Sequence, residues 1–117
     1  IIATAWDNRA EITPATGGEV RAAVAEVLAA LDRGNLRAAM KRDGAWQANE
    51  WVKQAILLSF RLEETKPRHG GYDKVALKWD GWGDTDFKIA GFRAVPGAVV
   101  RKGAYIAPGV VLMPSFV

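Results

Sequence analysis

The sequence contains no cysteine, which excludes disulfide bonds, thiolate catalysis and cysteine-ligated metal sites. No apolar run reaches the roughly 18 residues that a membrane-spanning helix needs, and the first residues are not arranged as in a signal peptide. A single histidine, His69, leaves no pair of histidines for a metal or catalytic motif. We therefore expect a cytoplasmic protein that does not associate with membranes.

The sequence also has only a small excess of basic over acidic side chains. The 16 Lys and Arg side chains oppose 13 Asp and Glu side chains, and the net charge of +3 is spread along the chain. This pattern disfavours nucleic acid as a partner. Half of the 117 residues are hydrophobic and 25% are charged, which is typical of one soluble globular unit with a modest core.

Common enzyme motifs are absent: the sequence has no G-x-G-x-x-G, no P-loop and no G-x-S-x-G segment. Asp80, Asp84 and Asp86 resemble the start of a calcium loop, but its glycine and bidentate glutamate are missing, so solvated turn carboxylates are favoured. His69 lies in a charged loop, where a lone histidine is typically solvated. We assign no catalytic residue and no metal site.

What is present is a six-residue repeat over residues 94–117, which reads A-V-P-G-A-V, V-R-K-G-A-Y, I-A-P-G-V-V and L-M-P-S-F-V. Every unit starts with an apolar residue and carries a turn-forming pair at its third and fourth positions. The pairs are Pro96-Gly97, Lys102-Gly103, Pro108-Gly109 and Pro114-Ser115. Short strands bent at every sixth residue form the hexapeptide type of parallel β-helix. The alternative is a Pro- and Gly-rich tail with a chance rhythm.

Three sides close one coil of such a β-helix, and this predicts which residues stack. Ala94 lies beneath Leu112, eighteen residues further along, whereas Val100 and Ile106 have no hexad above them. Each coil buries its apolar row only against a neighbour, and an uncovered end exposes unpaired backbone groups. We therefore expect the front part of a longer protein, truncated just after its β-helix begins.

The residues before the repeat show helical spacing. Residues 1–9 predict a short amphipathic helix, and the segment from Thr16 to Glu19 reads as a capping box for a second helix that Gly34 ends. The apolar stripe of the second helix consists of Val20, Val24, Val27, Leu28 and Leu31, with Arg21, Glu26 and Asp32 facing water.

A hairpin over residues 36–48 is predicted by the turn pair Asp43-Gly44, which places Met40 and Trp46 near each other. Asn49 is placed to cap a third helix over residues 50–62, which is apolar over more than half its circumference and therefore largely buried.

A charged loop over residues 63–71 comes next, followed by a strand over residues 72–79 that turns Lys74 and Lys78 to solvent. Asp84 is then placed to cap one or two helical turns through Asp86 to Ala90, which Gly91 ends. The fold class is therefore α+β. A mostly α-helical domain with a small hairpin occupies residues 1–92, and the start of a hexapeptide-repeat β-helix occupies residues 93–117.

Two sets of residues have two interpretations each. The five tryptophans suit core packing better than stacking on bases or sugars, because four of them sit at amphipathic positions. Arg93 lies where the α-rich region meets the first hexad. Its planar fork suits a carboxylate ligand, and it equally suits a surface salt bridge to Asp84 or Asp86.

Five segments carry a resemblance to a known family, in the same order and over nearly the whole chain. They are A-E-I-T-P at 10–14, D-G-A-W at 43–46, I-L-L-S-F-R at 56–61, G-F-R-A-V-P at 91–96 and V-L-M-P-S-F-V at 111–117. Together they resemble the front of the bacterial tetrahydrodipicolinate N-succinyltransferases. This pattern is more specific than the hexad repeat, which many acyltransferases share.

The resemblance implies a homotrimer whose subunit has an N-terminal α domain, a left-handed β-helix and a small C-terminal region. It implies succinyl transfer from succinyl-CoA, a co-substrate, to the amino group of ring-opened tetrahydrodipicolinate on the route to diaminopimelate and lysine. No permanently bound cofactor is implied. In that family the arginine of the G-F-R-x-V-P segment binds the dicarboxylate substrate, and here that residue is Arg93.

Departures from the family pattern fall in residues 63–72 and 79–85. The later coils, which carry an acidic substrate-site residue and the CoA groove in the family, lie beyond Val117, so we expect residues 1–117 alone to be inactive. Two alternatives stay open: a non-catalytic module for oligomerisation or for an acidic partner, and a hexad-repeat acyltransferase with another acceptor.

Overall fold

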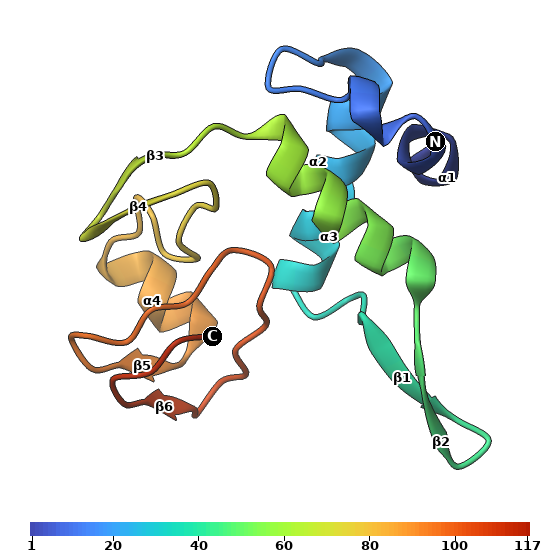
Figure 1. Ribbon diagram of the computed structural model, residues 1–117. Coiled ribbons are helices and arrows are strands. Elements are labelled where there is room, and N and C mark those ends of the chain that lie inside the picture. Colours follow the sequence, from blue (N-terminus) through green and yellow to red (C-terminus); the bar gives the residue numbers. More distant parts are fainter.

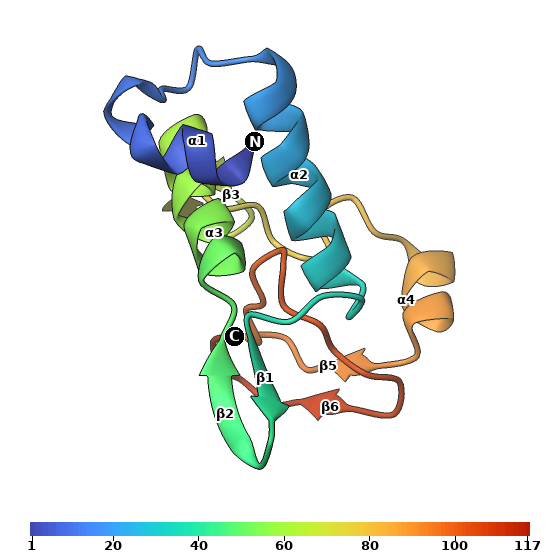
Figure 2. The ribbon, with the colours of Figure 1, turned by 90° about the vertical axis from the view of Figure 1, so that its right-hand side faces the viewer.

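The computed structural model describes all residues from Ile1 to Val117. Three N-terminal helices pack together on one side of the molecule, a C-terminal coil lies on the other, and one hairpin extends away from both (Figures 1 and 2). The elements are α1 (Ile2–Asp7), a 3-10 turn η1 (Arg9–Glu11), α2 (Gly18–Asp32), β1 (Ala39–Arg42), β2 (Ala45–Ala48), α3 (Glu50–Leu62), β3 (Lys66–Arg68), β4 (Gly71–Asp73), α4 (Asp84–Ala90), β5 (Arg93–Ala94) and β6 (Val111–Leu112).

The predicted helices form, and their apolar stripes meet in one core. The core residues of α2 lie at helical spacing and pack against those of α3, with Ile2 and Ala5 of α1 closing one side. The buried residues of α2 and α3 are Val24, Val27, Leu31, Val52, Ala55, Leu58 and Leu62. The expectation that α3 is largely buried is only half correct, because Trp51 and Leu57 are exposed on its outer face.

The side-chain caps predicted at Thr16 and Asn49 are wrong. The Thr16 hydroxyl accepts a hydrogen bond from the N–H of Thr13 at 3.0 Å, so it stabilises the preceding turn, and Gly17 stands at the N-cap of α2. Asn49 occupies the N-cap of α3, yet its amide donates to the carbonyl of Arg37 at 2.6 Å. Both side chains hydrogen-bond to the backbone of the preceding loop instead of the first turn of the helix. Thr and Asn side chains can make either kind of local hydrogen bond.

The β1–β2 hairpin has the predicted turn, with positive φ at Asp43 (50°) and Gly44 (79°). Its register pairs Met40 with Gln47 and Lys41 with Trp46. Met40 and Trp46 therefore lie on opposite faces of the ribbon, and the predicted proximity is wrong by one residue of register.

The strand predicted over residues 72–79 does not form. Residues 66–73 make a small antiparallel hairpin instead, with His69 and Gly70 at its turn, and Gly70 takes a φ of 80°. Only Leu77 makes a further bridge, and its antiparallel partner is Arg101. The predicted loop over residues 63–71 is thus partly strand, and the predicted solvent face is wrong at Lys78, which is buried.

The α4 helix forms and ends where the sequence predicts, but the predicted cap at Asp84 is wrong, because Gly83 occupies the N-cap. The N–H of Gly83 donates to the Asp86 carboxylate at 2.8 Å, so Asp86 satisfies the helix start, while Asp84 occupies the first helical position. Gly91 ends the helix with a φ of 77°, a left-handed conformation that favours glycine.

The hexad region winds back over itself with the predicted spacing. Strand β5 pairs in parallel with β6, and the register sets Ala94 beside Leu112, as the repeat predicts. The N–H of Val95 donates to the carbonyl of Leu112 at 2.9 Å, and a second parallel bridge joins Val99 to Phe116. Three of the four corners use glycine at positive φ: Gly97, Gly103 and Gly109.

The second side of the coil is covered by the segment at residues 76–78. The N–H of Lys78 donates to the carbonyl of Val100 at 2.8 Å, and the N–H of Lys102 donates to the carbonyl of Ala76 at 2.9 Å. Val100 is completely buried as a result. The expectation that Val100 has no cover is therefore wrong, since a non-repeat segment packs there.

A buried ion pair joins the helices to the coil. The Lys78 ammonium lies 3.0 Å from the Asp32 carboxylate and 2.9 Å from the Asp32 carbonyl, at the end of α2. The same carboxylate accepts the N–H of Gly103 at 2.9 Å. The prediction that Asp32 faces water is wrong. Asp32 is half-buried because Lys78 and Gly103, which are distant in sequence, pack against it.

A second ion pair holds the β3–β4 hairpin on the coil. The Arg101 guanidinium donates to both oxygens of Asp73 at 3.1 Å, and the Asp73 carboxylate also accepts the N–H of Lys74 at 2.8 Å. Partial burial by itself raises the pKa of Asp73, but the Lys74 N–H and the Arg101 guanidinium outweigh it, so the pKa lies below its ordinary value of 3.8.

This pair predicts a pH-dependent stability. The folded-state pKa of Asp73 is below the unfolded one, so its stabilisation is fully present above about pH 4 and is lost as the pH falls through the folded pKa. We expect Arg101→Met to lower the urea midpoint near neutral pH, with the difference from wild type narrowing as the pH falls toward about 3. A difference of the same size at both pH values would contradict this role of the Asp73 carboxylate.

The molecule thus mixes helices with small two-stranded sheets, so the α+β part of the fold prediction is confirmed. Core packing of the tryptophans is only partly confirmed. Trp6, Trp79 and Trp82 are half-buried, whereas Trp46 and Trp51 are exposed, Trp46 to 69%. The hairpin that carries Trp46 extends away from the body (Figure 1), and all residues of its two strands are exposed.

Candidate functional site

A hollow of about 670 Å³ lies where the end of α4 and strand β5 face the turn of the β3–β4 hairpin. Gly91 sets the sharp corner between α4 and β5. A Cβ atom at this position would stand 3.2 Å from the Cβ of Pro108, a crowded contact that adds to the strain of a side chain at a φ of 77°. The side chains on the walls are His69, Leu77, Trp79, Phe87, Phe92 and Arg93.

An aromatic cluster forms one wall of this hollow. Phe92 is buried, and its ring centroid lies 6.0 Å from those of both Trp79 and Phe87. Trp82 meets Phe87 edge to face at 5.1 Å. Such packed rings have few alternative rotamers, so the cluster gives the residue after Phe92 a fixed starting point. The sequence placed Trp79 and Phe92 on separate elements and gave no sign that they meet.

Arg93 follows this cluster directly. Its backbone N–H donates to the carbonyl of Val110 at 2.9 Å, so the parallel pairing of β5 holds its backbone. Its side chain is exposed and makes no hydrogen bond or ion pair within the chain. The backbone of Arg93 is therefore fixed, whereas its guanidinium is exposed and unpaired beside the hollow.

The surface salt bridge considered for Arg93 does not form. Asp84 pairs with Lys88 at 2.8 Å, four residues along the same helix, and Asp86 accepts the N–H of Gly83. Both carboxylates of α4 are thus engaged elsewhere. The Arg93 side chain is exposed beside the hollow, and its predicted role in binding a carboxylate stays a prediction.

His69 lines the same hollow from the turn of the β3–β4 hairpin. The structure thus brings together two residues that stand far apart in sequence. No spacing rule could have indicated this, because the hairpin that carries His69 was itself not predicted. No group of three or more His, Cys, Asp or Glu side chains is arranged to hold a metal ion, and no helix has the length and apolarity to cross a membrane.

Comparison with known sequences decides the family. Residues 1–62, from α1 through α3, match the family described as "Tetrahydrodipicolinate N-succinyltransferase N-terminal". The chain belongs to this family. The resemblance seen in the sequence segments is thereby confirmed.

Curated relatives extend the similarity over the rest of the chain. The chain is 56% identical over 122 residues to a protein of Methylorubrum populi, with 99% of this chain and 44% of the relative covered. It is 57% identical over 122 residues to a protein of Paramagnetospirillum magneticum, with the same coverage. It is 53% identical over 124 residues to one of Parvibaculum lavamentivorans, with 100% and 44% covered. All three are named 2,3,4,5-tetrahydropyridine-2,6-dicarboxylate N-succinyltransferase.

The chain therefore spans less than half the length of the family members that it matches. The family match over α1–α3 covers the helical core, whereas the hollow at Arg93 falls in the part that only the longer matches include.

Proposed function

We propose that the protein carrying this chain is a succinyltransferase that moves a succinyl group from succinyl-CoA to the amino group of ring-opened tetrahydrodipicolinate. Membership of the family carries this proposal, together with the name that the relatives share. That name specifies an acceptor with two carboxylates. The reaction would belong to the route to diaminopimelate and lysine.

Arg93 is the residue of this chain that we assign to the acceptor. A planar guanidinium binds a carboxylate through two parallel hydrogen bonds, which fixes direction as well as distance. Such a contact needs an unpaired guanidinium, a fixed backbone and space for the ligand, and Arg93 has all three. The aromatic cluster that precedes it in the chain fixes the backbone from which the guanidinium extends.

Succinyl transfer needs a neutral amine that attacks the thioester carbonyl, a proton acceptor for that amine and a leaving CoA thiolate. Arg93 would orient the acceptor and supply none of these groups, because a guanidinium stays protonated in proteins. We assign no proton transfer to His69. The general base and the CoA contacts are proposed to lie in the remainder of the protein.

The finer architecture belongs to the same proposal. We propose that residues 93–117 begin a left-handed β-helix and that residues 1–92 form a separate N-terminal domain. The parallel β5–β6 pairing at a spacing of eighteen residues and the glycine corners support this. We also propose a cytoplasmic homotrimer, in which neighbouring subunits would complete the hollow at Arg93.

The activity is tested on the whole protein. We expect CoA thiol to be released from succinyl-CoA only when a 2-amino-6-oxodicarboxylate acceptor or a close dicarboxylate analogue is present, with the succinylated amine as the second product. An analogue that lacks one carboxylate is the matched control and should react much more slowly. Equal rates with the two acceptors would contradict dicarboxylate recognition, and no thiol release with either would contradict the transferase.

A further inference from the structure

We propose that a second hollow, between α2, the end of α3 and residues 66–76, binds a small multivalent anion of phosphate chemistry. It has a volume of about 270 Å³ and shares no residue with the hollow at Arg93. Five basic side chains and one acidic side chain line it, a local excess of four positive charges in a chain whose net charge is +3. They are Arg21, Lys66, Arg68, Lys74, Lys102 and Glu63.

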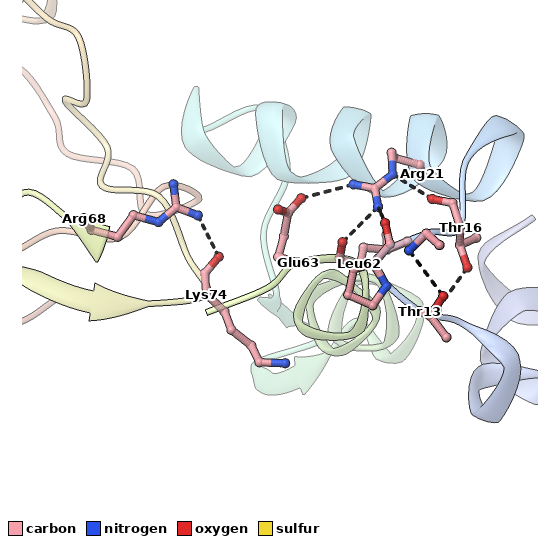
Figure 3. A network of polar contacts seen from close by, with 9 residues as sticks. Thr13, Thr16, Arg21, Leu62, Glu63, Arg68 and Lys74 are labelled. Carbon is pink, nitrogen blue, oxygen red and sulfur yellow. Dashed lines mark hydrogen bonds and ion pairs between the residues drawn. The ribbon is translucent and has the colours of Figure 1, made fainter. Parts of the chain in front are cut away.

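Arg21 is held rigidly at one end of this hollow (Figure 3). Its Nε donates to the carbonyl of Thr16 at 2.8 Å, and its Nη2 donates to the carbonyls of Pro14 and Leu62 at 2.7 and 2.9 Å. Its Nη1 lies 3.2 Å from Glu63, which is the only carboxylate that lines the hollow. Glu63 offsets the charge of Arg21, so the local excess of four positive charges lies on the other four basic side chains.

Arg68 and Lys74 are held in the same manner. Arg68 donates to the carbonyl of Lys74 at 3.1 Å (Figure 3), and the Lys74 ammonium donates to the carbonyl of Phe60 at 3.1 Å. Both side chains keep further N–H groups beyond these contacts, because a guanidinium has five donors and an ammonium has three. Neither takes part in an ion pair. Three of the five basic side chains, Arg21, Arg68 and Lys74, are thus positioned in advance.

The two remaining cations reach the hollow from different elements. Lys66 belongs to β3, and Lys102 stands at the corner of the second hexad. Both are exposed, and neither makes a hydrogen bond or an ion pair through its side chain. They are free to close over a bound group.

Basic side chains that line one hollow repel one another when the hollow is empty. A bound polyanion would offset this electrostatic repulsion. A phosphate group offers two negative charges and three strong acceptor oxygens, which matches two fixed basic groups and two mobile lysines. The hollow is slightly smaller than the roughly 300 Å³ at which drug-sized ligand pockets begin. A compact anion therefore fits better than a complete nucleotide.

Calorimetric titration of the whole protein with inorganic diphosphate, and separately with inorganic phosphate, tests this at low ionic strength, where screening is weak. We expect saturable binding, tighter for diphosphate. The double variant Lys66→Ala/Lys102→Ala should bind at least about tenfold more weakly, because it loses two charge-assisted contacts. The matched control, Lys41→Ala/Lys53→Ala, removes the same charge from exposed positions on β1 and α3 and should bind as wild type does.

The activity assay separates this site from the proposed succinyltransferase site. The Lys66/Lys102 variant should keep the wild-type KM for succinyl-CoA, so failure of the anion site and failure of the proposed function give different results. The proposal is overturned by the absence of saturable anion binding, by equal weakening in the control variant, or by a variant that binds diphosphate normally. A raised KM for succinyl-CoA in the variant would also overturn it, since the basic array would then serve the co-substrate.

Discussion

Replacement of Arg93 by alanine in the whole protein should lower kcat/KM for the dicarboxylate acceptor by roughly 30-fold to several-thousand-fold. This range corresponds to the about 2–5 kcal/mol lost when one partner of a close charge pair is removed. Arg93 has no partner within the chain, so its removal leaves no unpaired group behind in the free protein. The loss should therefore appear in substrate binding and turnover, with little change in the urea midpoint. Steady-state kinetics with each substrate varied in turn measure it.

Two controls separate geometry from charge. Arg93→Lys keeps the positive charge but loses the planar fork, so it should recover only part of the lost kcat/KM. Arg61→Ala removes an exposed arginine of α3 that lines neither hollow, and it should leave kcat/KM near that of wild type. An unchanged kcat/KM in Arg93→Ala, or an equal loss in Arg61→Ala, would contradict the assignment of Arg93 to the acceptor.

The repeat was the part of the fold that the sequence predicted best. A period of six requires only that corner residues recur in phase, and the corners at Gly97, Gly103 and Gly109 take the positive φ angles that favour glycine. The pairing of Ala94 with Leu112 then follows from counting residues. The core helices were also predictable, because apolar residues at helical spacing form one stripe and that stripe is the face that becomes buried.

Structure that depends on contacts between residues distant in sequence was not predicted by periodicity. Residues 72–79 alternate as a strand would, yet they do not form one strand: residues 72 and 73 pair with β3, and residues 76–78 hydrogen-bond to the second hexad. Lys78 was assigned to solvent on the alternation rule, although Asp32 and the carbonyl at the end of α2 compensate its charge in the interior. A periodicity rule contains no information on a partner that lies 46 residues away.

The candidate site was predictable at one position only. Arg93 stands at a junction that the repeat defines, whereas His69, Trp79 and Phe87 reach the same hollow from elements whose packing no local pattern encodes. The basic hollow beside α2 was missed altogether, because its cations are scattered over the sequence from Arg21 to Lys102. Only the fold gathers them.

The largest effect on stability is expected from Asp32→Ala. This change leaves the Lys78 ammonium buried, with 5% of its side chain exposed, and without its counter-charge. It also removes the acceptor of the Gly103 N–H at the junction between α2 and the coil. Loss of one partner from a buried ion pair costs about 3–5 kcal/mol. The Lys78 ammonium would keep only the backbone carbonyl of residue 32 as an acceptor, which does not replace the lost counter-charge. Urea unfolding followed by tryptophan fluorescence measures this cost.

The exposed pair between Asp84 and Lys88 provides the matched control, since it joins the same residue types at 2.8 Å with 81% and 75% of the side chains exposed. Asp84→Ala should lower the unfolding free energy by only about 0.3–0.5 kcal/mol, as for other helix pairs four residues apart. The double variant Asp32→Leu/Lys78→Met should recover part of the loss of Asp32→Ala, because an apolar pair needs no counter-charge in the interior. Equal losses in Asp32→Ala and Asp84→Ala would mean that water reaches Lys78, and the joint between α2 and the coil would then depend on the Gly103 hydrogen bond and apolar packing alone.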